Sequence, residues 1–118
     1  MAKLEQTFKG KYEDVVAFIE ETLTSEKLSC ELESGSDYKT GEVEVTVRVY
    51  ERYSFSGGNR LSISITIVSN GEDIYLSAIT SGGSQAVFFK MNRIGENRLL
   101  NQFESLLIEY IRKTTHHA

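Results

Sequence analysis

The side chains of this sequence that could do chemistry are one thiol, two imidazoles and carboxylates spread along the sequence. Cys30 lies between Leu28 and Leu32 at alternate positions, which is typical of a small apolar residue on the buried face of a strand. His116 and His117 stand at the other end of the sequence. A catalytic triad needs a histidine held by its neighbours, and a metal site needs ligands beyond a histidine pair. We therefore expect no catalytic residue and no metal site.

The carboxylates fall on polar positions of the predicted elements, as Glu42 and Glu44 do, where solvation alone explains them. The pair Gly82-Gly83 lacks the Lys-Ser/Thr that follows the glycines of a phosphate-binding loop. Nothing in the sequence indicates a cofactor. We interpret the chain as a binding domain rather than an enzyme.

A glycine-rich stretch, residues 81–90, is the first segment that could bind a partner. Adjacent glycines followed by polar donors form either a backbone nest for an anion or an ordinary turn. Alternate turns of a meander share one end of the sheet, so the turn at residues 56–60 should lie beside this stretch. A small apolar or anionic ligand would then be bound by Arg60, Gly82, Gly83, Gln85 and Phe88.

The spacing of apolar residues predicts one α+β domain over residues 1–118, with residues 114–118 as a frayed tail. The predicted order is (strand)–helix–four or five antiparallel strands–helix. Amphipathic helices are expected at 11–25 and 96–113, and alternation predicts strands at 3–9, 28–32, 43–50 and 61–68 and another after Asn70-Gly71. A polar turn is expected at 34–41. Residues 85–91 form either a further strand or a buried connection.

Each predicted helix has one apolar stripe, so both helices should pack on one face of an antiparallel sheet. Two arrangements satisfy this. The sheet is either flat with its other face exposed, or curled around the C-terminal helix as in helix-grip domains, which hold apolar ligands. We favour the flat sheet, because a helix-grip interior usually needs a longer chain.

Asn70-Gly71 is the strongest hairpin signal in the sequence. With these two residues as the loop, Ile65 would lie opposite Leu76 on the buried face. Thr66 would then lie opposite Tyr75 on the other face. The same interpretation places the valines at 43, 45, 47 and 49 on the buried face.

The exposed face of the predicted sheet is the second part of the protein that could bind a partner. We expect it to carry Arg48, Tyr50, Arg52, Ser62, Ser64, Thr66, Tyr75, Ser77 and Ile79. Tyrosine and arginine are enriched where proteins bind one another. We therefore predict self-association, or binding of another protein, through an interface of Arg48, Tyr50, Arg52, Thr66, Tyr75 and Ile79. The alternative is a plain solvated face.

Net charge argues against some classes of partner, and cysteine content indicates a cellular compartment. A net charge of −4 and a pI near 5.2 argue against nucleic acid and against anionic membranes as partners. No apolar stretch is long enough to span a bilayer, and the polar N-terminus does not resemble a signal peptide. A single cysteine fits a reducing cytoplasm.

Three segments carry a family resemblance: Val49-Tyr50-Glu51-Arg52-Tyr53, Asn59-Arg60-Leu61-Ser62 and Gly82-Gly83-Ser84-Gln85-Ala86-Val87-Phe88-Phe89-Lys90. With them the chain resembles a family of small uncharacterised bacterial proteins, mainly from Firmicutes, that form a domain of unknown function. The Gly-Gly-x-Gln-x-x-Phe-Phe stretch is the most specific part. The resemblance implies a stand-alone cytoplasmic protein and no particular activity.

Overall fold

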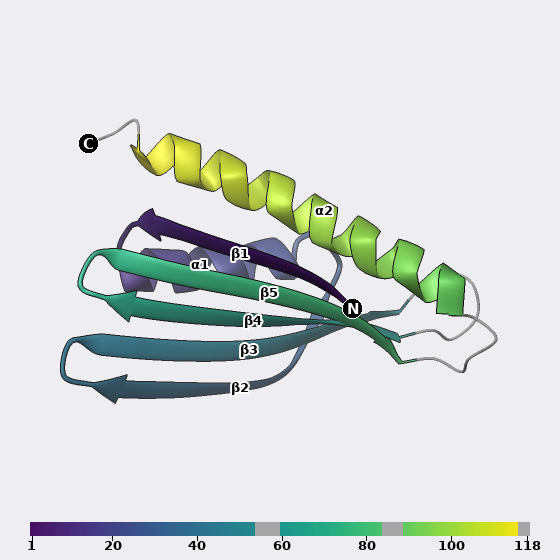
Figure 1. The fold of residues 1–118 in the computed structure, drawn as a ribbon, viewed down its shortest axis with the longest axis horizontal. Helices are drawn as coiled ribbons and strands as arrows, with labels where there is room; N and C mark the ends of the chain where they lie inside the picture. The colour runs from purple at the N-terminus through teal and green to yellow at the C-terminus, as the bar shows by residue number, and fades with distance from the viewer. Residues whose placement is uncertain (54–59, 84–88, 116–118) are drawn as a thin grey trace.

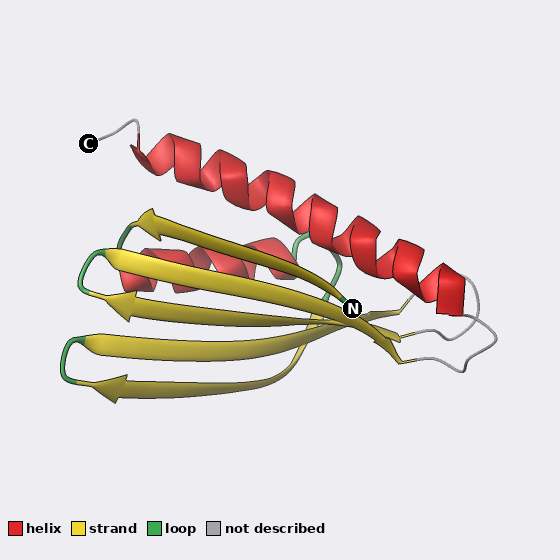
Figure 2. Cartoon of the chain, viewed as in Figure 1, coloured by secondary structure: helices red, strands yellow, loops and turns green. Residues whose placement is uncertain are grey.

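A computed structural model describes residues 1–53, 60–83 and 89–115. These residues form an α+β fold of five strands and two helices, as the sequence predicts (Figure 2). The strands are β1 (Ala2–Lys9), β2 (Glu31–Thr40), β3 (Val43–Tyr53), β4 (Arg60–Asn70) and β5 (Asp73–Gly83). The helices are α1 (Tyr12–Leu23) and α2 (Phe89–Thr115).

The five strands form one open sheet in the order β1-β5-β4-β3-β2, and all neighbouring strands are antiparallel (Figure 1). Strands β2 to β5 form the expected meander. The fifth strand is the N-terminal one, because β1 pairs with β5. Of the stretch 85–91, residues 89–91 begin α2 and residues 85–88 lie outside the described part. The sheet is open, with β1 at one edge and β2 at the other.

Both helices cover one face of the sheet, which we call the inner face. Their buried residues share one core with the inner-facing residues of β4 and β5. Phe18 of α1 stacks on Tyr110 of α2, with ring centroids 4.2 Å apart. The core consists of Leu4, Val15, Ile19, Leu23, Leu28, Cys30, Tyr50, Leu61, Ile63, Ile65, Ile67, Ile74, Leu76, Ala78, Leu99, Leu100, Phe103 and Leu107. The molecule is a two-layer slab with extents of 47 × 30 × 21 Å.

The C-terminal helix is longer than its apolar stripe suggests. It begins at Phe89 and ends at Thr115, so it includes the first two residues of the predicted frayed tail. The hydroxyls of Thr114 and Thr115 donate to carbonyls one turn back in the helix. Residues 116–118 lie outside the described part. Neither described helix is both long and apolar enough to cross a membrane.

The β2–β3 hairpin and the β4–β5 hairpin each have a tight two-residue loop, which consists of a glycine followed by a glutamate. Gly41 and Gly71 have φ of 59° and 62°, which suits glycine at the first position of a two-residue loop. Glu42 and Glu72 are the second loop residues, because Thr40 opposes Val43 and Asn70 opposes Asp73.

The predicted β4–β5 register is therefore wrong by two residues. Ile65 opposes Ala78, Ile67 opposes Leu76, and Thr66 opposes Ser77 rather than Tyr75. The loop is Gly71-Glu72, since a positive φ is available at Gly71 while Asn70 stays in the strand. A two-residue shift leaves every side chain on its predicted face, and Ile65 and Leu76 are both fully buried.

The polar segment expected as a turn is the edge strand β2. Its residues are exposed along their whole length, because β2 pairs with β3 on one side only. A bulge between Leu32 and Ser34 interrupts the pairing. Leu28 and Cys30 are buried as predicted, but they precede the strand.

Candidate functional site: the outer face of the sheet

The sheet face opposite the helices, which we call the outer face, is uncovered by any element of the described part of the chain. In Figure 1 the strands lie in front of α1, so the viewer looks onto this face. Strands β2 to β5 each contribute alternate residues to it, and none of those in the middle of the face is charged. We call this set the uncharged patch: Ser34, Ser36, Tyr38, Thr40, Val43, Val45, Val47, Val49, Ser62, Ser64, Thr66, Val68, Tyr75, Ser77, Ile79 and Ser81.

The valines of β3 lie on the outer face, and this corrects the sequence prediction. Arg48 opposes the buried Ile65, and Tyr50 opposes the buried Ile63. Arg48, Tyr50 and Arg52 therefore face the helices and do not belong to an outer interface. Valine favours a sheet on either face, so four alternating valines do not decide which side is buried.

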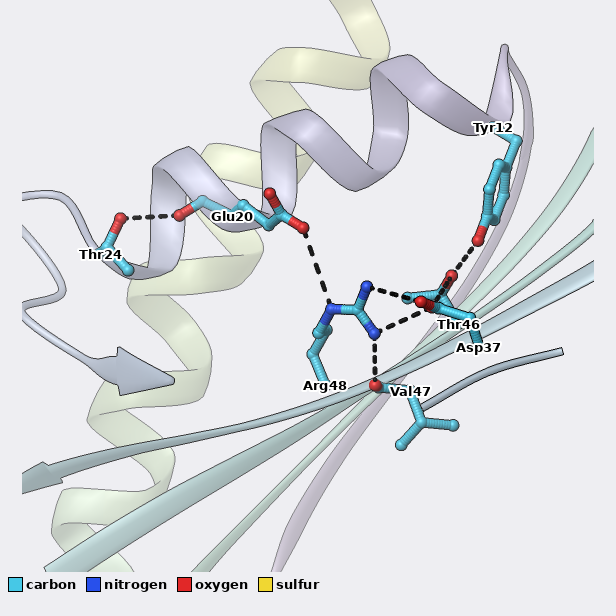
Figure 3. Close-up of polar contacts among 7 residues, drawn as sticks. All are labelled: Tyr12, Glu20, Thr24, Asp37, Thr46, Val47 and Arg48. Atoms are coloured by element: carbon cyan, nitrogen blue, oxygen red, sulfur yellow. Dashed lines mark hydrogen bonds and ion pairs between the residues drawn. The ribbon is translucent and has the colours of Figure 1, made fainter. Parts of the chain in front are cut away.

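Arg48 is tolerated on the inner face because acidic groups surround it (Figure 3). Its guanidinium donates to both Asp37 carboxylate oxygens, at 2.9 and 3.3 Å, and lies 3.9 Å from a Glu20 oxygen. The Thr46 hydroxyl also donates to Asp37, at 3.0 Å, and contacts the Tyr12 hydroxyl. Hydrogen bonds from Arg48 and then Thr46 lower the pKa of Asp37. The cluster links α1 and the edge strand β2 to β3.

Tyr50 and Arg52 also have roles on the inner face. The Tyr50 side chain is 1% exposed, and its hydroxyl has no hydrogen-bond partner within the described residues. Burial, and then the nearby Glu20 charge, raise the pKa of Tyr50. Arg52 donates to the Leu28 carbonyl at 3.1 Å and to Gln102 at 3.2 Å. Arg52 therefore ties the α1–β2 connection and α2 to the sheet.

The other three predicted interface residues, Thr66, Tyr75 and Ile79, lie on the outer face. Ile79 is 37% exposed, and Thr66 lies between Val47 and Ser77. The Tyr75 hydroxyl donates to Glu5 of β1 at 2.6 Å. This bond is the main cause that lowers the pKa of Glu5 and raises that of Tyr75.

A groove of about 510 Å³ lies at the hairpin end of β1, β5 and β4. Its lining is mostly apolar, with an ion pair between Lys9 and Asp73 at its rim. The lining residues are Thr7, Phe8, Lys9, Val68, Asn70, Asp73, Ile74 and Tyr75. The groove therefore adjoins the uncharged patch at Val68 and Tyr75.

The predicted ligand site around Gly82 and Gly83 is at the other end of these strands. Both glycines belong to β5, and Gly83 opposes Arg60. The Arg60 guanidinium forms ion pairs with Glu33 and Glu51 and lies 5.4 Å from the centroid of the Tyr53 ring. Two carboxylates already compensate its charge, which leaves little attraction for an anion. Gln85 and Phe88 lie outside the described residues.

Cys30 has the properties of a structural cysteine. It is 4% exposed, and burial raises its pKa to about 11. A buried thiol with a raised pKa is a poor nucleophile. Across residues 1–53, 60–83 and 89–115, no three histidine, cysteine or acidic side chains gather as metal ligands would.

Sequence reasoning missed most of the uncharged patch. The alternation of β3 was visible, but its face was assigned from the valines. Arg48 and Tyr50 favour the opposite assignment, in which they face the helices and the valines are on the outer face. A long cation and an aromatic ring can both reach partners under a helix.

Comparison with known proteins gives a family match along most of the chain. The model of the Family of unknown function (DUF6054) matches residues 1–111, from β1 nearly to the end of α2. No curated protein and no solved structure matches the chain.

Proposed function

We propose that this chain, which belongs to the family of unknown function DUF6054, is a protein-binding domain that pairs with a second copy of itself through the outer face. The observation that supports this is the uncharged patch, which spans four strands and is uncovered in the described part of the structure. Depletion of charge at the centre of a surface is typical of interface cores. Apart from its hydroxyl groups, the patch resembles half of a β-sandwich interior.

The outer face has the area that a stable dimer needs. Five strands about 4.8 Å apart and about ten residues long present roughly 800 Å² of sheet surface. A standard protein interface buries about this area on each partner. Two such sheets, packed face to face about 10 Å apart, would form a sandwich with a helical layer on each outside.

A second copy is the partner whose chemistry fits best. Its own uncharged patch would bury no unpaired charge against this one, and burial of an unpaired charge is costly. Charged outer-face residues lie toward the margins, with both signs present: Lys3, Glu5 and Lys9 on β1, and Glu51 with Arg60 at the far end. We place this association in the cytoplasm, where a single free thiol stays reduced.

The substitution Val47→Glu tests the proposal. Val47 lies in the middle of the patch, between Ser36 and Thr66, so its replacement puts a carboxylate at the centre of the interface. We expect the unchanged chain to sediment as a dimer at micromolar concentration and the variant as a monomer. The matched control is Ser105→Glu on the exposed side of α2, which should remain dimeric.

Thermal unfolding of the Val47→Glu variant tests whether the variant is monomeric only because it fails to fold. A cooperative transition would show that the variant folds and that only association is lost. The proposal is wrong if the unchanged chain is monomeric at high micromolar concentration. It is also wrong if Val47→Glu and Ser105→Glu weaken the dimer equally.

A further inference from the structure

We infer that the free edge of β2 pairs with β2 of a second copy, antiparallel and centred on Tyr38, so that the two sheets join into one. Strand β2 is the last strand of the sheet and pairs only with β3 (Figure 1). All 10 of its residues are exposed. The contact uses the edge of the sheet and not its outer face, so it is separate from the outer-face dimer and does not rest on it.

The backbone of β2 has hydrogen-bonding groups directed at this free edge. Thr40 and Val43 flank the two-residue loop of the hairpin, and residues that flank such a loop form a hydrogen-bonded pair. Because such pairs alternate along an antiparallel ladder, Gly35, Asp37 and Lys39 direct their N–H and C=O groups away from β3. Within the described part of the chain, no second strand pairs with this side of β2. A row of this kind is a template to which another strand can add.

The same alternation restricts the register of two such edges. An edge-directed residue must lie opposite an edge-directed residue of the partner, so the two-fold axis passes through a residue of β2. An axis at Asp37 or at Lys39 would oppose two like charges, which is destabilising. An axis at Ser36 would put Asp37 opposite Gly35 and would carry the ladder across the bulge that follows Leu32. An axis nearer either end of the strand shortens the overlap.

An axis at Tyr38 opposes unlike charges instead. Asp37 then lies opposite the partner's Lys39 on the inner face, and the two-fold axis repeats this pair. Within each chain, Lys39 Nζ lies 3.6 Å from a Glu44 carboxylate oxygen, and Asp37 binds Arg48. The order of charges from one chain into the next is therefore negative, positive, negative, positive. Opposite charges at facing positions of neighbouring strands stabilise a sheet.

The helices leave room for this contact. Helix α1 packs against β3, and in Figure 1 it lies behind the other side of the sheet, away from β2. Two copies of β3 would be three strand spacings apart, about 14 Å, whereas the axes of packed helices are roughly 8–10 Å apart. The overlap covers only residues 36–40 of each copy. We therefore expect a contact that forms at high protein concentration and leaves the Val47→Glu variant monomeric at micromolar concentration.

Disulfide trapping in the Val47→Glu background tests the pairing, because this substitution removes any outer-face dimer and the native Cys30 is buried. Tyr38→Cys puts a thiol on the axis, in a non-hydrogen-bonded pair with its own copy. The Cα atoms of such a pair are about 4.5 Å apart, which a disulfide accepts. With a mild oxidant at high protein concentration, Tyr38→Cys should form covalent dimers. Ser36→Cys and Thr40→Cys oppose each other across the axis and should form them only when mixed.

The controls separate pairing from random collision and from another register. Lys39→Glu sets a glutamate opposite the partner's Asp37 and should slow the Tyr38→Cys crosslink several-fold. Lys113→Glu makes the same change of charge in the last turn of α2 and should not slow it. Equal effects of these two substitutions, equal self-crosslinking at positions 36, 38 and 40, self-crosslinking at position 36 alone, or no crosslink at all overturns the inference. Each of these outcomes leaves the outer-face dimer to its own test.

Discussion

Gly35 of the edge strand lies opposite Arg48, and the arginine side chain passes directly over the glycine backbone. A Cβ atom at position 35 would come within 2.9 Å of both Cδ and a terminal nitrogen of Arg48. The neighbouring Val47 carbonyl would be 3.2 Å away. The absence of a side chain at position 35 is therefore what lets the guanidinium reach Asp37.

Gly35→Ala should displace Arg48 from Asp37 and lower the free energy of unfolding by about 1–3 kcal/mol, as overpacking does. Urea unfolding measures the loss. Gly10→Ala is the matched control and should change stability little, because a Cβ atom at position 10 would lie 3.6 Å or more from its neighbours. In an Arg48→Ala background the Gly35→Ala substitution should cost much less. Equal costs in the two backgrounds would contradict the contact.

The Asp37–Arg48 pair should stabilise the fold at neutral pH and lose its effect in acid. The pKa of Asp37 is lowered in the folded protein, so its contribution is complete above the unfolded pKa and disappears as pH falls through the folded pKa. Asp37→Asn should therefore be less stable than the unchanged chain at pH 7. Urea titrations at successive pH values should show this difference shrinking below about pH 4, the ordinary pKa of aspartate. A difference that is constant across pH would contradict the assignment.

Leu76→Ala should cost about 2–5 kcal/mol of unfolding free energy, because Leu76 is fully buried. Its cross-strand neighbour is Ile67, whereas Ile65 lies diagonally across from it. A double-mutant cycle of Leu76→Ala with Ile67→Val should accordingly give a larger coupling than one with Ile65→Val. The reverse order would favour the register that takes Asn70-Gly71 as the loop.

Cys30 should react with thiol reagents only when the protein unfolds. Its pKa of about 11 and its burial leave little accessible thiolate at pH 8. A Ser105→Cys variant supplies an exposed thiol on α2 for comparison and should react at once, with one equivalent of reagent. Rapid modification of Cys30 in the native chain would show that the thiol is reachable.

The helices and most of the strand faces could be predicted because their patterns have one interpretation. Val15, Ile19 and Leu23 follow the helical period and are all fully buried. The buried face of β4 could also be predicted from the sequence, because its isoleucines at odd-numbered positions alternate with serine and threonine. Here the sequence pattern and the burial agree.

For strand β3, the sequence pattern does not determine which face is buried. Alternation shows that two faces differ, but the choice between them depends on partners elsewhere in the chain. Arg48 is stable inside because Asp37 and Glu20 reach it from β2 and α1. Strand β2 itself could not be recognised, because an edge strand exposed on both faces has no apolar period to detect.

The order of the sheet also has a consequence for how the chain folds. Strands β2 to β5 pair with sequence neighbours, whereas β1 pairs only with β5, so that Ala2 lies opposite Thr80. Contacts between distant residues are slow to form, because the intervening loop must close first. On the ribosome β1 is synthesised first but has no strand to pair with until β5 emerges. We expect Leu4 and Phe8 to have low Φ values, and conservative truncations there to speed unfolding more than they slow folding.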